Sequence, residues 1–204
     1  MRKIIYCFFT VIVLGIPLLY AQEIERAELS TEKCIVFLYT GCPEEKLLAM
    51  EMLRESCSAD KEVVEALIYC LHEGTLFSAR KGGKITNDFW YVRAKSAELL
   101  GDIRDPQALT ALHLSLRYDP DLLVKSCVAK AIGKIGSPDS IPHLARAIET
   151  SPTSGPDEIF VKACVEAVGE IGHKEGFWVL AGVIRSGYRR DIRLAAQEAM
   201  RKLQ

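Results

Sequence analysis

The 204-residue sequence has few aromatic side chains, which make up 8% of it, and almost no net charge, at −1. A protein that coats nucleic acid needs a strong excess of cations, so this balance argues against that class. Cys-x-x-Cys spacings are missing, and the four histidines stand far apart in the sequence. We therefore expect no metal site and no bound cofactor. After residue 20 no apolar run approaches the length of a membrane span.

The N-terminus has the features of an export signal. A cationic start is followed by 17 uncharged residues, Ile4 to Tyr20. Gly15 and Pro17 interrupt this run shortly before Ala21, a small residue of the kind that precedes a signal cleavage site. We expect removal of residues 1–21 and export to the periplasm or beyond. The alternative is an uncleaved inner-membrane anchor, which would be the chain's single contact with a membrane.

Four later segments align with one another without gaps. Their first residues are 32, 36 and 32 positions apart: Val92, Val124, Phe160 and Ile192. Within each segment apolar residues recur at three-residue steps with small residues between them, as one face of a helix requires. In the first three, a turn and a second amphipathic segment follow. Intervals of this length are typical of stacked two-helix units.

The second segments share an apolar stripe at i, i+3, i+7 spacing, which we expect to face the core. No unit can bury such a stripe alone, so the sequence predicts an all-α fold, a curved α-solenoid of stacked two-helix repeats. The expected inward residues are Leu109, Leu112 and Leu116, then Ile141, Leu144 and Ile148, then Phe177, Leu180 and Ile184.

These segments resemble HEAT repeats of the phycobilisome-lyase type, which have the pattern Val-Arg-x-x-Ala-Ala-x-Ala-Leu-Gly-x-Ile-Gly-Asp-Pro before an apolar second helix. Val92-Arg93, Gly101 and Asp105-Pro106 match it best, within residues 89–204. The resemblance implies HEAT-like repeats whose second helices line a concave surface. It also implies an alternative function, an accessory lyase-like enzyme or a chaperone that acts on a cofactor-bearing protein. Repeat positions alone carry over no catalytic residue.

The region before these repeats is more divergent. Residues 44–73 predict one further unit, with two apolar helices around a polar turn. Residues 22–43 are expected to hold a capping helix over 30–40, begun by Ser30 or Thr31. The β-branched and aromatic content of that segment leaves a strand open as the alternative.

Two insertions interrupt the period. In residues 74–88, a Lys-Gly-Gly-Lys sequence indicates a protruding β-hairpin or ordered loop. Arg80, Lys81 and Lys84 are candidates for contact with an acidic partner or a phosphate, and a solvated connector is the alternative. The second insertion, 150–158, is rich in Ser, Thr, Pro and Gly and is expected to be a flexible connector.

Six cysteines follow the expected cleavage site. The best disulfide candidate is Cys42 with Cys70, because these residues should lie at neighbouring ends of antiparallel helices. Cys57 lies at the opposite end, beside the turn. Cys127 and Cys164 occupy helix positions that suit free, buried thiols.

Catalysis has little support in the sequence. The HEAT-repeat deoxyhypusine hydroxylases build a di-iron site from several His-Glu pairs, whereas this chain has the single pair His72-Glu73, which is typical of a polar helix end. We therefore expect no catalytic residues. The sequence favours a non-enzymatic, exported scaffold or adaptor that binds a protein or peptide in the cell envelope.

Candidate partner-binding residues remain once the inward positions of the second helices are set aside. Trp178 stands out, because an accessible Trp is a frequent binding anchor; the alternative is that it covers the edge of the last helix. His143, Arg146 and Thr110 occupy the preceding second helices.

Charge is unevenly distributed along the chain. Residues 22–79 hold 12 acidic and 5 basic side chains, a balance of −7, and residues 160–204 hold 5 acidic and 8 basic ones, a balance of +3. This polarity is consistent with an oriented partner or with head-to-tail self-association, and equally with an ordinary solvated surface. Arg185 and Arg189 belong to the densest basic group, which we expect near Trp178.

Overall fold

The computed structural model describes residues 30–56 and 60–203. The expected signal peptide and Cys57 lie outside these residues. No helix within the described ranges is long and apolar enough to cross a membrane.

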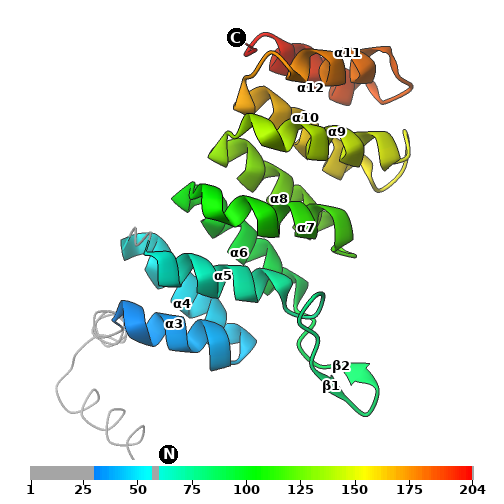
Figure 1. Cartoon of the computed structure of the whole chain (residues 1–204). Helices are drawn as coiled ribbons and strands as arrows, with labels where there is room; N and C mark the ends of the chain where they lie inside the picture. Colours follow the sequence, from blue (N-terminus) through cyan, green and yellow to red (C-terminus); the bar gives the residue numbers. More distant parts are fainter. Residues whose placement is uncertain (1–29, 57–59, 204) are drawn as a thin grey trace, which may run out of the picture.

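The described residues form a stack of paired antiparallel helices (Figure 1). The first helices of the pairs lie in one layer and the second helices in the other. The first-helix layer contains α4 (Pro43–Ser56), α6 (Trp90–Ile103), α8 (Leu122–Ile135), α10 (Glu158–Ile171) and α12 (Arg190–Met200). The second-helix layer contains α3 (Thr31–Thr40), α5 (Lys61–His72), α7 (Leu109–Tyr118), α9 (Ile141–Thr150) and α11 (Gly176–Arg185).

This architecture confirms the expected all-α solenoid of two-helix, HEAT-like repeats. The four residues that mark the period, Val92, Val124, Phe160 and Ile192, occupy equivalent positions in α6, α8, α10 and α12, and all are buried. A single apolar core runs through the stack from Cys34 in α3 to Ala199 in α12. Each unit therefore buries its apolar face against its neighbours.

Small residues bring successive first helices into close contact. A Cβ atom added at Gly101 would lie 2.7 Å from the Ala131 Cα atom of α8, and one at Gly133 would lie 2.9 Å from the Ala167 Cα atom of α10. Gly169 has the same relation to Ala199 of α12. From α6 onward, contacts between successive second helices are far less extensive, so in this part of the stack the first-helix layer is the more tightly packed of the two.

The turns within the units use the helix-start residues that the sequence supplies. Short 3₁₀ turns, Pro106–Ala108 and Pro138–Ser140, lead into α7 and α9. The Asp105 carboxylate accepts a hydrogen bond from the Gln107 amide at 2.8 Å and so caps the first of these turns. At the other end of the stack, the Ser30 side chain caps α3 by accepting from the Lys33 amide.

An antiparallel β-hairpin projects between α5 and α6. Its strands are β1 (Arg80–Lys81) and β2 (Lys84–Ile85), with Arg80 paired to Ile85 and Lys81 to Lys84. In Figure 1 the hairpin extends away from the stack, on the edge where the loops between units lie.

Two expectations about packing are wrong. Phe177 was expected to face the core but is 44% exposed, because it lies on the first turn of α11 and no described unit stacks beyond it. Cys42 and Cys70 form no disulfide. Cys42 is exposed, whereas Cys70 is buried in α5 and its thiol donates to the Leu38 carbonyl oxygen at 3.1 Å.

Candidate partner-binding face

The exposed side chains of three successive second helices form one surface, which we call the second-helix face. In each helix the exposed positions recur at i, i+3 or i+4, and i+7, so they form a stripe that extends over two helical turns. The face consists of Thr110, Leu114 and Arg117 of α7, Pro142, His143, Arg146, Glu149 and Thr150 of α9, and Trp178, Gly182 and Arg185 of α11.

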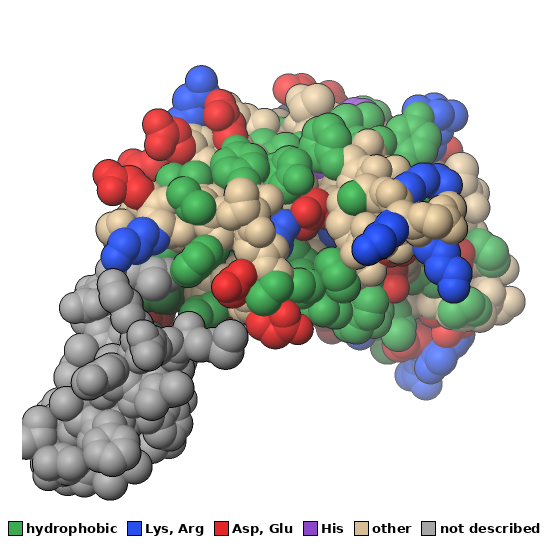
Figure 2. Space-filling model, turned by 90° about the horizontal axis from the view of Figure 1, so that it is seen from below, with side chains coloured by type: hydrophobic (Ala, Val, Ile, Leu, Met, Phe, Trp, Pro, Cys, Tyr) green, Lys and Arg blue, Asp and Glu red, His purple; other side chains and the backbone are tan. Residues whose placement is uncertain are grey.

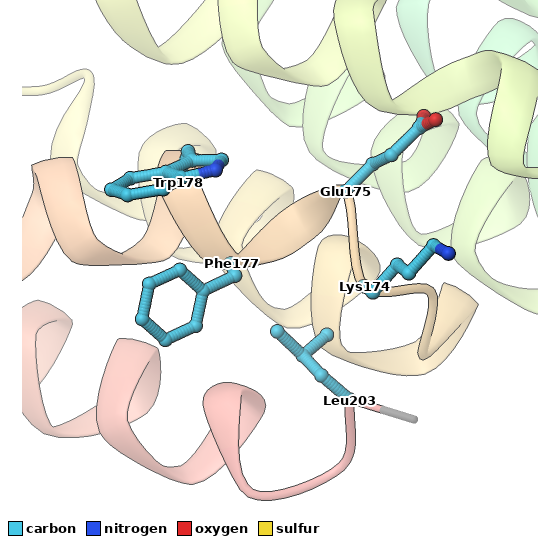
Figure 3. Close-up of a pocket in the computed structure, with 5 residues that line it drawn as sticks. All are labelled: Lys174, Glu175, Phe177, Trp178 and Leu203. Atoms are coloured by element: carbon cyan, nitrogen blue, oxygen red, sulfur yellow. The ribbon is translucent and has the colours of Figure 1, made fainter.

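Trp178 is the most accessible large apolar side chain on this face, with 72% of its surface exposed. Its ring meets the Phe177 ring edge to face, with centroids 5.3 Å apart and an interplanar angle of 86°. Figure 3 shows the two rings on different sides of α11, with Phe177 on the side of Leu203. An exposed fraction this large means that Trp178 does not serve to cover α12.

A pocket of about 440 Å³ adjoins the Trp178 ring (Figure 3). Phe177, Trp178 and Leu203 supply its apolar lining, and Lys174 and Glu175 stand at the turn that leads into α11. An apolar pocket with charged groups at its margin suits an apolar side chain of a partner flanked by polar groups.

His113 and His143 form a stacked pair between α7 and α9. Their ring centroids are 3.9 Å apart and the planes are nearly parallel, at 9°. The histidines stand far apart in the sequence, yet these two lie face to face in the fold. Their separation of 30 residues is close to the repeat interval, and this was the signal that they lie on neighbouring helices.

His113 is the inner, partly buried ring of the pair. The His113 Nε2 atom lies 2.9 Å from the Ser140 hydroxyl oxygen. Burial, reinforced by the neighbouring His143, lowers the pKa of His113 to about 4. A neutral His113 ring therefore supports the exposed His143 ring at neutral pH, without charge repulsion between them.

Of the two arginines expected near Trp178, only Arg185 lies on the second-helix face. Arg185 lies two helical turns from Trp178 on the same side of α11, about 10 Å along the axis. Arg189 was expected to share this region, but it lies in the loop before α12. There its guanidinium pairs with Glu158 at 3.0 Å and with Asp191 at 3.4 Å, so it belongs to the loop edge.

The hairpin cations also lie away from the second-helix face. Arg80, Lys81 and Lys84 are exposed on the loop edge of the stack. The structure therefore separates two groups of candidate residues, the second-helix face and the hairpin. Among the described residues no cluster of three or more His, Cys, Asp or Glu side chains is arranged to hold a metal ion.

Sequence reasoning missed two buried ion pairs beneath the hairpin. The Lys46 ammonium of α4 lies 2.6 Å from the Glu73 carboxylate, and the Arg93 guanidinium of α6 donates to Asp119 at 2.7 Å. All four side chains are at most 8% exposed. His72 is also buried, and its Nε2 group lies 3.2 Å from the Ala111 carbonyl oxygen. The pair His72-Glu73 is thus part of the packing between units.

Comparisons with known proteins agree with this architecture. Residues 84–156 match the family model for HEAT repeats. None of the curated proteins compared with the chain shows significant similarity to it.

One similar solved chain belongs to the complex of CpcE and CpcF of phycocyanin lyase from Nostoc sp. PCC7120. The two chains superimpose with a TM-score of 0.67 and are 20% identical. The match covers 87% of this chain and 66% of the Nostoc chain, just under two thirds of its length. At this identity the likeness concerns the fold.

Proposed function

We propose that the chain is a HEAT-repeat scaffold or adaptor that binds a protein or peptide partner through the second-helix face. The observation that carries this proposal is Trp178, which is 72% exposed beside an apolar pocket and in line with the exposed stripes of α7 and α9. Exposed Trp residues frequently dominate the binding energy of an interface.

The rest of the face supplies the polar part of such an interface. His143, held against His113, presents a ring of fixed orientation, and Arg146 lies one turn further along α9. Thr110 and Arg185 extend the surface over the neighbouring units. Fixed rings lose little conformational entropy on binding, which favours them as contact residues.

We further propose that this partner is met outside the cytoplasm, in the periplasm or cell envelope. The support is the sequence of residues 1–21, with its cationic start, uncharged run and small residue at position 21.

A second candidate function has one specific observation in its favour. The similar solved chain is part of a phycocyanin lyase complex, so an accessory role on a cofactor-bearing protein, as a lyase-like enzyme or a chaperone, fits the same fold. The fold alone does not transfer chemistry between relatives of low identity. For that reason we favour the scaffold over the lyase-like role.

The test is affinity capture from an envelope extract with the double variant W178A/R146A. We expect at least a tenfold loss of partner capture, because truncation of a hot-spot Trp costs about 2 kcal/mol or more. Both side chains are exposed, so helical circular dichroism should stay unchanged.

The matched control is Trp90→Ala, the same residue type on the loop edge, where it is 45% exposed. This variant should capture the partner as the wild type does. Undiminished capture by W178A/R146A would remove the second-helix face from consideration. A chromophore or metal ion recovered with the purified protein would favour the lyase-like role.

A further inference from the structure

The hairpin between α5 and α6 is a small, fully exposed element. Every residue from Leu76 to Thr86 is exposed, and the two tip residues, Gly82 and Gly83, have φ of 58° and 80°. Consecutive positive φ values form the tight turn that joins two twisted strands directly. Nothing lies within 4 Å of either tip position where a Cβ atom would stand, so the tip is free on all sides.

The base of the hairpin is nevertheless fixed to the stack. The Asn87 side chain accepts a hydrogen bond from the Ala79 amide and donates one to the Phe77 carbonyl, both at 2.8 Å. Asp88, the next residue, pairs with the buried Arg93 guanidinium at 2.5 Å. These contacts hold the hairpin at a defined position relative to α6.

The charge of the hairpin is uncompensated. Residues 74–87 contain Arg80, Lys81 and Lys84 and no acidic residue. The flanking carboxylates are already engaged, since Glu73 pairs with Lys46 and Asp88 with Arg93. Three positive charges thus project from the body on one short element.

Apolar side chains accompany these cations. Leu76 and Ile85 on the hairpin are 49% and 39% exposed, and Trp90 at its foot is 45% exposed. Figure 2, seen from the α3–α4 end, shows Lys and Arg side chains gathered at the right of the molecule with hydrophobic side chains beside them. Cations next to exposed Trp and aliphatic side chains are typical of elements that lie at a membrane interface.

The pairing of the strands distinguishes between kinds of acidic partner. Arg80 stands opposite Ile85, and Lys81 stands opposite Lys84, so neighbouring residues project to opposite faces of the hairpin. A flat acidic protein surface would contact the cations of one face. A layer of anionic headgroups entered end-on by the tip would surround both faces.

We propose that this hairpin docks the protein, tip first, onto a bilayer surface rich in anionic lipids. Lys81 and Lys84 enter the headgroup layer first, and the opposed residues Arg80 and Ile85 follow one step behind them. This contact is independent of residues 1–21 and of the second-helix face. Its affinity should fall as salt is raised, because the attraction between cations and headgroups is screened.

The test is co-sedimentation of the chain from Gln22 onwards with lipid vesicles. The apolar core of the described residues runs from Cys34 to Ala199, and the apolar run 4–20 is absent from this form. We expect binding to vesicles of phosphatidylcholine mixed with phosphatidylglycerol and little binding to phosphatidylcholine alone. The variant R80E/K81E/K84E should bind at least about one hundredfold more weakly, since each cation near the surface contributes about fivefold.

The matched control reverses the same number of positive charges at sites away from the hairpin. In K130E/R201E/K202E three other exposed cations are reversed, and vesicle binding should fall much less. Equal losses in the two triple variants would show that only net charge matters and would overturn the proposal. So would equal binding of the wild type to neutral vesicles, or no binding to anionic ones. Capture of an acidic protein through the hairpin without vesicle binding would favour a protein partner instead.

Discussion

The Arg93 guanidinium, with a side chain that is 1% exposed, is held entirely by oxygen acceptors of neighbouring elements. It donates to Asp119 through Nε and Nη2, and to Asp88 and the Glu73 carbonyl through Nη1. A buried charge of this kind is stable while its partners are present, because they replace the water it has lost. Arg93 therefore links α6 to the end of α7 and to the base of the hairpin.

Asp119→Asn tests this link at the residue scale. We expect a loss of about 3 kcal/mol in the free energy of unfolding, because the variant leaves a buried guanidinium without its main counter-charge. Urea unfolding followed by circular dichroism would measure it.

The matched control is Asp102→Asn. Asp102 pairs with Lys134 at 2.6 Å, but both side chains are at least 40% exposed, so we expect a loss of less than about 1 kcal/mol. Similar losses in the two variants would contradict the importance assigned to burial.

At the scale of the helices, glycine determines how closely the units approach. The glycines Gly101, Gly133 and Gly169 recur at the same place in α6, α8 and α10, and each faces an alanine of the next first helix. Glycine is a poor helix former, so its use inside three helices reflects the contact across them.

Gly101→Ala should destabilise the protein by about 1–3 kcal/mol, although alanine favours a helix, because the added Cβ atom would lie 2.7 Å from the Ala131 Cα atom. Gly182→Ala in α11 is the opposite case. Nothing lies within 4 Å of its added Cβ atom, so the same change should stabilise by about 0.5–1 kcal/mol. Thermal unfolding of both variants would show the two signs, and a stabilising Gly101→Ala would refute the close contact.

The sequence was sufficient to predict the helical stack, because a period near 32 residues places apolar and small residues at equivalent positions in every unit. Contacts between units were harder to foresee. The pair of His113 and His143 depends on how far neighbouring second helices are offset, and the pairing of Arg93 with Asp119 depends on where α7 ends. Phe177 followed the pattern of the inward stripe, but no later unit covers it in the described residues.

The molecule as a whole is expected to be an exported protein. If residues 1–21 act as a signal, protein recovered from the cell envelope should begin at Gln22, and N-terminal mass analysis would show it. The mature chain would then have 24 basic and 27 acidic residues, a net charge of −3. A chain that still begins at Met1 in the inner membrane would indicate an anchor, and one in the cytoplasm would contradict export.

The unequal packing of the two layers gives the stack a direction of easy bending. From α6 to α12, opening the first-helix layer would separate a glycine–alanine contact at each step, whereas α7, α9 and α11 contact one another sparsely. The first-helix layer is therefore the stiffer of the two layers, and the second helices move more easily relative to one another. Small rotations of the units about the first-helix layer would change the distances between Trp178, Arg146 and Thr110 while leaving the core intact. The second-helix face can thus adjust its curvature to partners of different shape at low cost in free energy.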